Sequence, residues 1–217
     1  MTLLVAAHGA TSLVPDRETA DADFGAPPEV VADPRLVDAL LRRGYVAERS
    51  NRFIRPHEAS KGEPLQLAID VLAPSRDHRL RSNQAYGDLY VDEIPGLRLA
   101  LARPAVKVEL NVALTSRARL RVALLLPDLV SAICMKAYAY QDRAKSGDSH
   151  DLWRLLEAGH VAGLSADDWP SGATGTDAAT RLRRHLGRPG APGLRDIADA
   201  KARARVVAIV NELVGRG

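Results

Sequence analysis

Two carboxylates, Asp21 and Asp23, stand one residue apart near the start of the chain. In an extended segment side chains alternate between two faces, so these carboxylates project to the same side, roughly 6.5–7 Å apart. Mg²⁺ prefers oxygen ligands, and one or two carboxylates hold it while positions stay open for substrate phosphates. The spacing points first to phosphoryl or nucleotidyl transfer, although an isolated Asp-x-Asp is also typical of a turn or a solvated strand end.

A third carboxylate interrupts an apolar segment further along the chain. Residues 65–72 alternate, are rich in aliphatic side chains and lie between two prolines, which predicts a strand; Asp70 lies within it. On a half-buried strand this side chain can simply face solvent. If the strand pairs with the one that carries Asp21 and Asp23, however, Asp70 completes a cradle of three carboxylates for a divalent metal.

The helix predicted for residues 128–143 carries a lysine at the centre of its apolar face. A step of about 100° per residue places Lys136 on one face with Leu129, Ile133, Ala137 and Tyr140. Burying an unpaired ammonium is costly, so Lys136 must reach solvent along its stem, pair with an acid or meet an anion. The anion of interest is the triphosphate of a nucleotide.

Acidic residues open the next predicted helix, at residues 148–158. Asp148 suits the N-cap, and Asp151, three residues on, favours the helix dipole. Both carboxylates also border the apolar face of this helix. Asp151 is therefore also a candidate partner for Lys136 or Arg143.

Two regions of different character must position these residues. Residues 1–12 suggest the end of a short apolar helix, residues 34–43 a second helix, and the basic residues 49–61 a loop. Residues 105–113 alternate as a strand does, and arginines follow at positions 117, 119 and 121.

Beyond Pro127 the hydrophobic period is helical throughout. Helices are expected at residues 128–143, 148–158, 166–186 and 194–214. The predicted fold class is therefore α+β, with a mixed sheet and flanking helices in residues 1–126 and a helical domain in residues 127–217.

The amino-acid composition limits the classes of protein to which this chain can belong. The 217 residues are 46% hydrophobic and 26% charged, as in ordinary globular proteins, and the net charge of +3 permits an anionic partner. Only 4% are aromatic, which argues against a base-stacking platform. The single cysteine, Cys134, excludes an internal disulfide and a multi-cysteine zinc site. With no apolar run near the ~18 residues of a membrane span and no signal peptide, a cytoplasmic protein without membrane contact is expected.

Together these residues resemble the nucleotidyltransferase-like toxins of the AbiEii and MenT type, within the polymerase-β-like nucleotidyltransferase superfamily. The family pattern is Arg-x-Thr-x-Asp-x-Asp, a third acid on a strand, and then a helical half bearing a lysine and an Arg-x-Lys and Asp-rich segment. The matching positions, within residues 5–157, are Arg17, Thr19, Asp21, Asp23, Asp70, Lys136, Arg143, Lys145 and Asp151.

The resemblance implies a Mg²⁺-dependent (or Mn²⁺-dependent) enzyme that transfers a nucleoside monophosphate from a nucleoside triphosphate to an acceptor. The implied catalytic residues are Asp21, Asp23, Asp70, Lys136 and Asp151. The three strand carboxylates would bind the metal, Asp70 would help to activate the attacking hydroxyl, and Lys136 would contact the triphosphate.

The resemblance also implies nucleotide contacts and partners. The implied nucleotide-binding residues are Arg17, Thr19, Lys136 and Arg143. The expected acceptor is RNA, in particular tRNA, and an antitoxin protein is a further expected partner. The basic residues 49–61 and the three arginines from position 117 are candidate contacts for RNA phosphates, although solvated surface explains them as well.

One family feature is absent from its expected place. Family members carry a Gly-Gly phosphate-binding turn about one helix before the Asp-x-Asp, where this chain has Gly9 alone. The resemblance then implies either a start further upstream or a shortened member with impaired nucleotide binding. Two other functions stay open: an antibiotic-modifying nucleotidyltransferase, and a non-catalytic relative that binds nucleotide, RNA or a partner protein.

Overall fold

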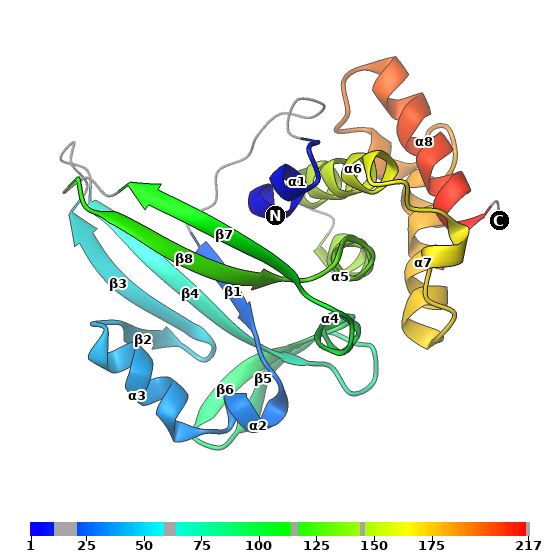
Figure 1. Ribbon diagram of the computed structural model, residues 1–217. Coiled ribbons are helices and arrows are strands. Elements are labelled where there is room, and N and C mark those ends of the chain that lie inside the picture. Colours follow the sequence, from blue (N-terminus) through cyan, green and yellow to red (C-terminus); the bar gives the residue numbers. More distant parts are fainter. Residues whose placement is uncertain (11–20, 59–63, 114–116, 144–145, 216–217) are drawn as a thin grey trace. The chain divides into compact units, whose positions relative to one another are not determined.

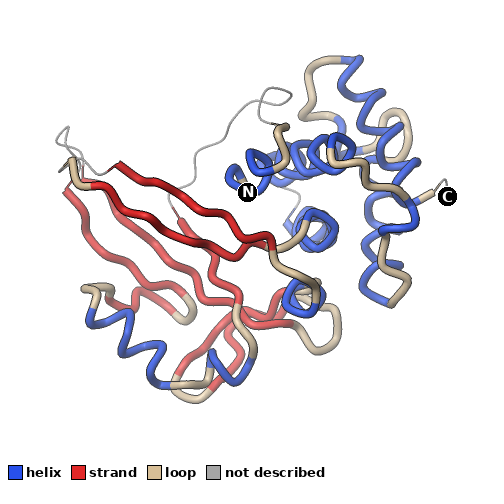
Figure 2. The backbone as a smooth tube through the Cα atoms, in the orientation of Figure 1, coloured by secondary structure: helices blue, strands red, loops and turns tan. Residues whose placement is uncertain are grey.

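A computed structural model describes residues 1–10, 21–58, 64–113, 117–143 and 146–215 (Figure 1). The protein is of mixed α and β structure, with its last helices following the strands (Figure 2). The chain forms two compact units: a strand-rich unit of Glu18–Leu101 and Glu109–Ala123, and a helical unit of Met1–Arg17, Ala102–Val108 and Leu124–Gly217. The helical unit thus includes the N-terminal helix as well as the residues beyond position 127.

The strand-rich unit contains a mixed sheet in the order β2-β3-β4-β6-β5, with β1 paired to β4. Its strands are β1 (Asp21–Gly25), β2 (Val46–Arg49), β3 (Arg52–Glu58), β4 (Pro64–Pro74), β5 (Arg81–Tyr86) and β6 (Leu89–Ile94). Three helices accompany them: α2 (Pro28–Val31), α3 (Pro34–Arg42) and α4 (Leu97–Ala102). The predicted strand at residues 65–72 and the predicted helix at residues 34–43 are confirmed.

The core of this unit explains why these elements form. The buried side chains of the cluster belong to Ala26, Val31, Phe53, Val71, Ala73, Tyr86, Leu89 and Val91. Leu36, Val37 and Leu40 pack against them, so α3 covers this core with its apolar side. Asp33 caps α3 by accepting a hydrogen bond from the backbone N–H of Arg35.

The prediction of a basic loop at residues 49–61 is wrong over most of its length. Arg49 ends β2, and Arg52 begins β3, which pairs antiparallel with both β2 and β4. Phe53 is 1% exposed, so this strand contributes to the core through the face opposite to Arg52. Lys61 lies outside the described residues.

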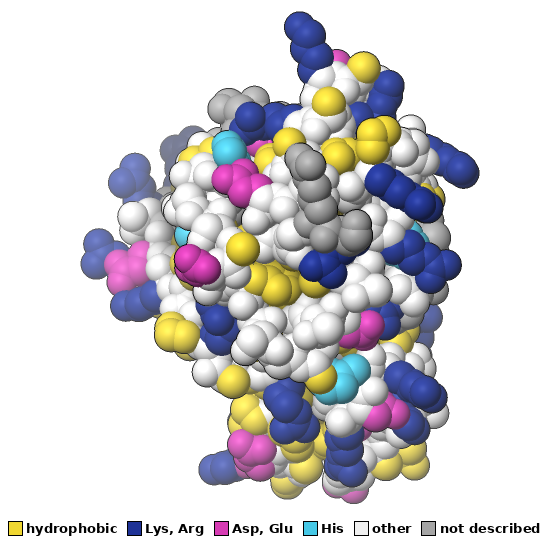
Figure 3. Space-filling view, turned by 90° about the vertical axis from the view of Figure 1, so that its right-hand side faces the viewer, with side chains coloured by type: hydrophobic (Ala, Val, Ile, Leu, Met, Phe, Trp, Pro, Cys, Tyr) yellow, Lys and Arg dark blue, Asp and Glu magenta, His cyan; other side chains and the backbone are white. Residues whose placement is uncertain are grey.

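A separate two-stranded sheet consists of β7 (Val106–Ala113) and β8 (Arg119–Leu126), whose residues are divided between the two units. The predicted strand at residues 105–113 is confirmed as β7. Arg119 and Arg121 are exposed on β8, and Arg117 is exposed just before it. On the face drawn in Figure 3, lysine and arginine side chains are interspersed with acidic ones.

The helical unit contains α1 (Thr2–Ala7), α5 (Leu129–Arg143), α6 (Ser146–Val161), α7 (Ala173–Leu186) and α8 (Ala200–Val214), with short 3₁₀ turns at Ala166–Asp168 and Pro192–Leu194. The prediction of α5 is confirmed, and the helix predicted at residues 148–158 lies within α6. The predictions for residues 166–186 and 194–214 are wrong at their starts. Helix α7 begins at Ala173, after Pro170, and α8 begins at Ala200, after its N-cap Asp199.

None of the helices in the described ranges is long and apolar enough to cross a membrane. Cys134 lies inside the helical unit, fully buried on α5. Burial raises the pKa of its thiol to about 12, so this cysteine stays protonated near neutral pH.

Gly175, in the first turns of α7, is expected to resist substitution. A Cβ there would lie 1.9 Å from the carbonyl oxygen of Pro170. Gly175→Ala should lower the free energy of unfolding by about 1–3 kcal/mol because the backbone must move, whereas glycine to alanine inside a helix normally stabilises. Gly172→Ala, where no atom lies within 4 Å, should cost at most about 1 kcal/mol. Urea unfolding of both variants checks the difference, and equal stabilities would contradict the packing.

Candidate functional site

The pairing of β1 with β4 brings the three strand carboxylates onto neighbouring strands. The two strands are parallel, and their register sets Asp21 opposite Ala68 and Asp23 opposite Asp70. Directly opposed residues of paired strands project to the same face, and so do residues two apart on one strand. Asp21, Asp23 and Asp70 therefore share one face of the sheet, as the hypothesis of a carboxylate cradle requires.

Arg52 completes a row of charged residues across three strands. It is the cross-strand partner of Asp70 on β3, while Asp23 is the partner of Asp70 on β1. Its guanidinium Nη1 donates to Asp70 Oδ2 at 2.7 Å and lies 3.7 Å from Asp21 Oδ2. Its Nε lies 3.4 Å from Glu48 Oε2. One guanidinium thus faces carboxylates from β1, β2 and β4.

Sequence reasoning missed this role of Arg52 because it assigned the residue to a loop. The signal was present in the spacing: β2 ends at Arg49 and β3 begins at Arg52, so only Ser50 and Asn51 separate two short segments that contain β-branched and aromatic residues. Two-residue connections are typical of β-hairpins. Recognising the hairpin would have placed Arg52 on a strand, and the pairing of that strand with β4 then sets it opposite Asp70.

Burial and like charges act together on Asp70. Desolvation of its carboxyl group, whose side chain is 14% exposed, raises the pKa above its usual value. Arg52 opposes this rise, while the carboxylates of Asp23 and Asp21 add to it. Arg49 also lowers the pKa of Asp70, so burial, the largest of these causes, accounts for the rise.

The donor chemistry of this cluster fits a hard divalent cation such as Mg²⁺, because every candidate ligand is a carboxylate oxygen. Within the described ranges, however, no group of three or more His, Cys, Asp or Glu side chains is arranged to hold a metal ion. Asp21 and Asp70 both face the guanidinium of Arg52, which is a positive charge already present at these carboxylates. A metal at these carboxylates would have to share them with that group.

In the helical unit, Lys136 is paired with two acids of α6. Its Nζ lies 2.8 Å from Asp151 Oδ2 and 3.4 Å from Asp148 Oδ1. Asp148 and Asp151 are 4% and 5% exposed, so the two carboxylates are buried and Lys136 is their counter-ion. The apolar face predicted around Lys136 is confirmed: Leu129, Ile133, Ala137 and Tyr140 are all buried.

The interpretation of Asp148 as an N-cap is wrong. Helix α6 begins at Ser146, so Asp148 lies inside its first turn and its side chain meets Lys136. The pair between Lys136 and Asp151, one of those considered for Asp151, is present. Since two carboxylates already neutralise the Lys136 ammonium, a phosphate contact would have to replace at least one of them.

Several implied nucleotide contacts fall outside the structure. Arg17, Thr19 and Lys145 lie outside the described residues, as does the side chain of Arg143, the last residue of α5. Asp21, Asp23 and Asp70 belong to the strand-rich unit, and Lys136 and Asp151 to the helical unit. The structure therefore defines two charged clusters, each within its own unit.

Helix α6 carries further buried polar groups that sequence reasoning did not single out. Arg154 is 1% exposed and donates to the Thr2 hydroxyl on α1 at 3.3 Å. Glu157, 2% exposed, accepts from Arg205 Nε on α8 at 2.8 Å. The signal was an ionisable residue at every third position, at 148, 151, 154, 157 and 160. Such spacing winds around a helix, so it cannot be confined to one solvated face.

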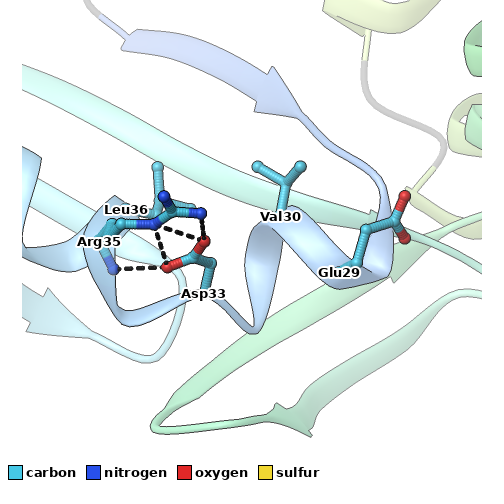
Figure 4. A pocket seen from close by; sticks show the side chains of 5 residues that line it. All are labelled: Glu29, Val30, Asp33, Arg35 and Leu36. Atoms are coloured by element: carbon cyan, nitrogen blue, oxygen red, sulfur yellow. Dashed lines mark hydrogen bonds and ion pairs between the residues drawn. The ribbon is translucent and has the colours of Figure 1, made fainter.

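A hollow beside α2 and α3 is lined by Glu29, Val30, Asp33, Arg35 and Leu36 (Figure 4). Asp33 and Arg35 turn toward one another, and Asp33 Oδ2 accepts from Arg35 Nε at 2.8 Å. Glu29 points away from this pair (Figure 4). Because the carboxylate of Asp33 is engaged in capping α3 and in this pair, we do not place a catalytic site here.

No family model, characterised protein or solved structure matches this chain.

Proposed function

We propose that this protein is a Mg²⁺-dependent nucleotidyltransferase that transfers a nucleoside monophosphate from a nucleoside triphosphate to RNA, similar to the AbiEii and MenT type of toxin. The observation that carries the proposal is the register of β1 and β4, which sets Asp23 opposite Asp70 with Asp21 on the same face. Three carboxylates on one face of two paired strands suit a divalent cation that also binds phosphates.

In this proposal Asp21, Asp23 and Asp70 hold the metal. When bound, Mg²⁺ polarises the reacting phosphate and stabilises the leaving pyrophosphate. Asp70 would also help to activate the attacking hydroxyl, as the resemblance to this type of toxin implies. Lys136 would contact the triphosphate after exchanging a carboxylate partner for a phosphate.

The direct test is transfer from α-labelled nucleoside triphosphates to an RNA pool that contains tRNA. We expect labelled RNA in the presence of Mg²⁺ and none after chelation with EDTA. The carboxylates are themselves negative, so without the metal they cannot offset the charge of the reacting phosphates. The same assay with an aminoglycoside in place of RNA tests the alternative of an antibiotic-modifying nucleotidyltransferase. Absence of Mg²⁺-dependent labelling of every acceptor would refute a nucleotidyltransferase.

One observation favours a second candidate, a non-catalytic relative that binds RNA or a partner protein. Arg52 already bridges Asp70 and Asp21, so the acid cluster has a positive charge of its own. This candidate predicts that neither Mg²⁺ nor Mn²⁺ binds the protein at millimolar concentration. Isothermal titration with each metal distinguishes it from the enzyme.

A further inference from the structure

The guanidinium of Arg52 lies within ion-pair distance of three carboxylates of the acid cluster. It bonds Asp70 at 2.7 Å, approaches Asp21 to 3.7 Å and reaches Glu48 at 3.4 Å through a different nitrogen. A guanidinium presents several donors in a fixed plane, so it can bridge carboxylates much as a cation does. Arg52 therefore does electrostatically what a bound metal ion would do at Asp21 and Asp70.

The guanidinium of Arg52 can form an ion pair with an inner or with an outer carboxylate. Asp70 is the inner partner, with a side chain 14% exposed, and Glu48 is an outer partner, with a side chain 41% exposed. The Arg52 side chain itself is 21% exposed, so it borders solvent. A long arginine side chain can leave Asp70 and keep an ion pair with Glu48 without crossing the core.

We propose that Arg52 competes with the divalent metal for Asp21 and Asp70, holding the carboxylates together before the metal arrives and turning toward Glu48 when it binds. This inference rests on the proposed function, because it concerns the same carboxylates. It makes metal binding an exchange of one cation for another. The protein thereby avoids a cluster of unbalanced carboxylates in its metal-free state.

The exchange predicts that metal affinity rises when Arg52 loses its charge. A hydrogen bond to a charged group contributes enough that its loss corresponds to about a 10-fold to 100-fold change in an equilibrium constant. Arg52→Gln keeps a donor near Asp70 but removes the competing charge. We expect it to bind Mn²⁺, measured by calorimetric titration, about 10-fold to 100-fold more tightly than the unaltered protein.

Arg55→Gln is the matched control, because it removes the same charge from the same strand but from a residue of the opposite face. The Arg55 guanidinium donates to the carbonyl oxygen of Arg43 and stacks on Tyr45. Its Mn²⁺ affinity should stay within about 3-fold of the unaltered protein, since exposed charges are screened over a Debye length of about 8 Å.

A measurement on the unaltered protein avoids any dependence on how well a variant folds. The Nε–H signal of Arg52 in a ¹⁵N spectrum should shift during titration with Mg²⁺, at the same midpoint as the calorimetric binding. Saturation with Mg²⁺ without a shift of that signal would overturn the exchange, as would equal or weaker Mn²⁺ binding by Arg52→Gln. If neither the unaltered protein nor Arg52→Gln binds Mn²⁺, the proposed function fails as well, and the inference with it.

Discussion

Replacing Lys136 with alanine is expected to lower the free energy of unfolding by about 3–5 kcal/mol. Lys136 is a counter-ion of Asp151 at 2.8 Å and of Asp148 at 3.4 Å, and both acids are buried, with side chains 6% exposed. Removing the ammonium takes from two buried carboxylates the ion-pair partner that offsets part of their charge. Breaking a buried ion pair by removing one partner is strongly destabilising, because that partner no longer replaces the hydration that the remaining charge lost on burial.

Urea unfolding followed by circular dichroism measures this loss, and two comparisons make it specific. Lys201→Ala removes an exposed lysine from α8 and should change the free energy of unfolding by less than about 0.5 kcal/mol. Combining Lys136→Met with Asp148→Asn and Asp151→Asn removes both acidic charges and should recover much of the stability. A Lys136→Ala protein as stable as Lys201→Ala would show that Lys136 is no buried counter-ion.

This result also bears on the expected role of Lys136 in nucleotide binding. A lysine that pairs with two buried carboxylates is first a structural residue that links α5 to α6. If it binds a phosphate in addition, nucleoside triphosphate should stabilise the unaltered protein and stabilise Lys136→Met less. The thermal shift produced by a nucleotide with Mg²⁺ separates these two contributions, since ligand that binds only the folded state raises its stability.

The local elements were predictable where a periodic pattern and its end signals agreed. For α3, the apolar spacing of Leu36, Val37 and Leu40 has a clear start after Asp33 and a stop at Gly44, whose φ is +80°. For α7 and α8 the apolar period extends beyond the true helix, and the starts depend on Pro170 and Asp199. The predicted boundaries were therefore wrong where a proline or a capping side chain, and not the periodicity, limits the helix.

Local sequence patterns could not predict which residues lie side by side in the candidate site. The alternation of β4 was visible in the sequence, but its pairing with β1 joins segments that two helices and a hairpin separate. The role of Asp70 was therefore a conditional hypothesis until the register was known. The role of Arg52 was not predicted for the same reason. A charged residue on a short strand can be assigned a role only when the carboxylate opposite it is known.

Asp23→Asn and Asp70→Asn are each expected to reduce Mg²⁺-dependent transfer at least about 100-fold. Removing a residue that merely supports a metal ligand typically costs 10-fold to 100-fold, and a ligand should cost no less. The two residues are direct partners across β1 and β4, so each substitution removes one charge from the same face. Asparagine keeps the size of the side chain, and the fold should therefore survive.

The matched control is Asp88→Asn, an exposed aspartate in the turn between β5 and β6, which should leave transfer unchanged. Calorimetric titration with Mn²⁺ should show weaker binding for Asp23→Asn and Asp70→Asn in proportion to their loss of transfer. Because Arg52 bonds Asp70 at 2.7 Å, Asp70→Asn also frees that guanidinium, and adding Arg52→Gln should restore part of the metal affinity. Full transfer by either single variant would remove the strand carboxylates from the mechanism, since the metal would then have to be held elsewhere.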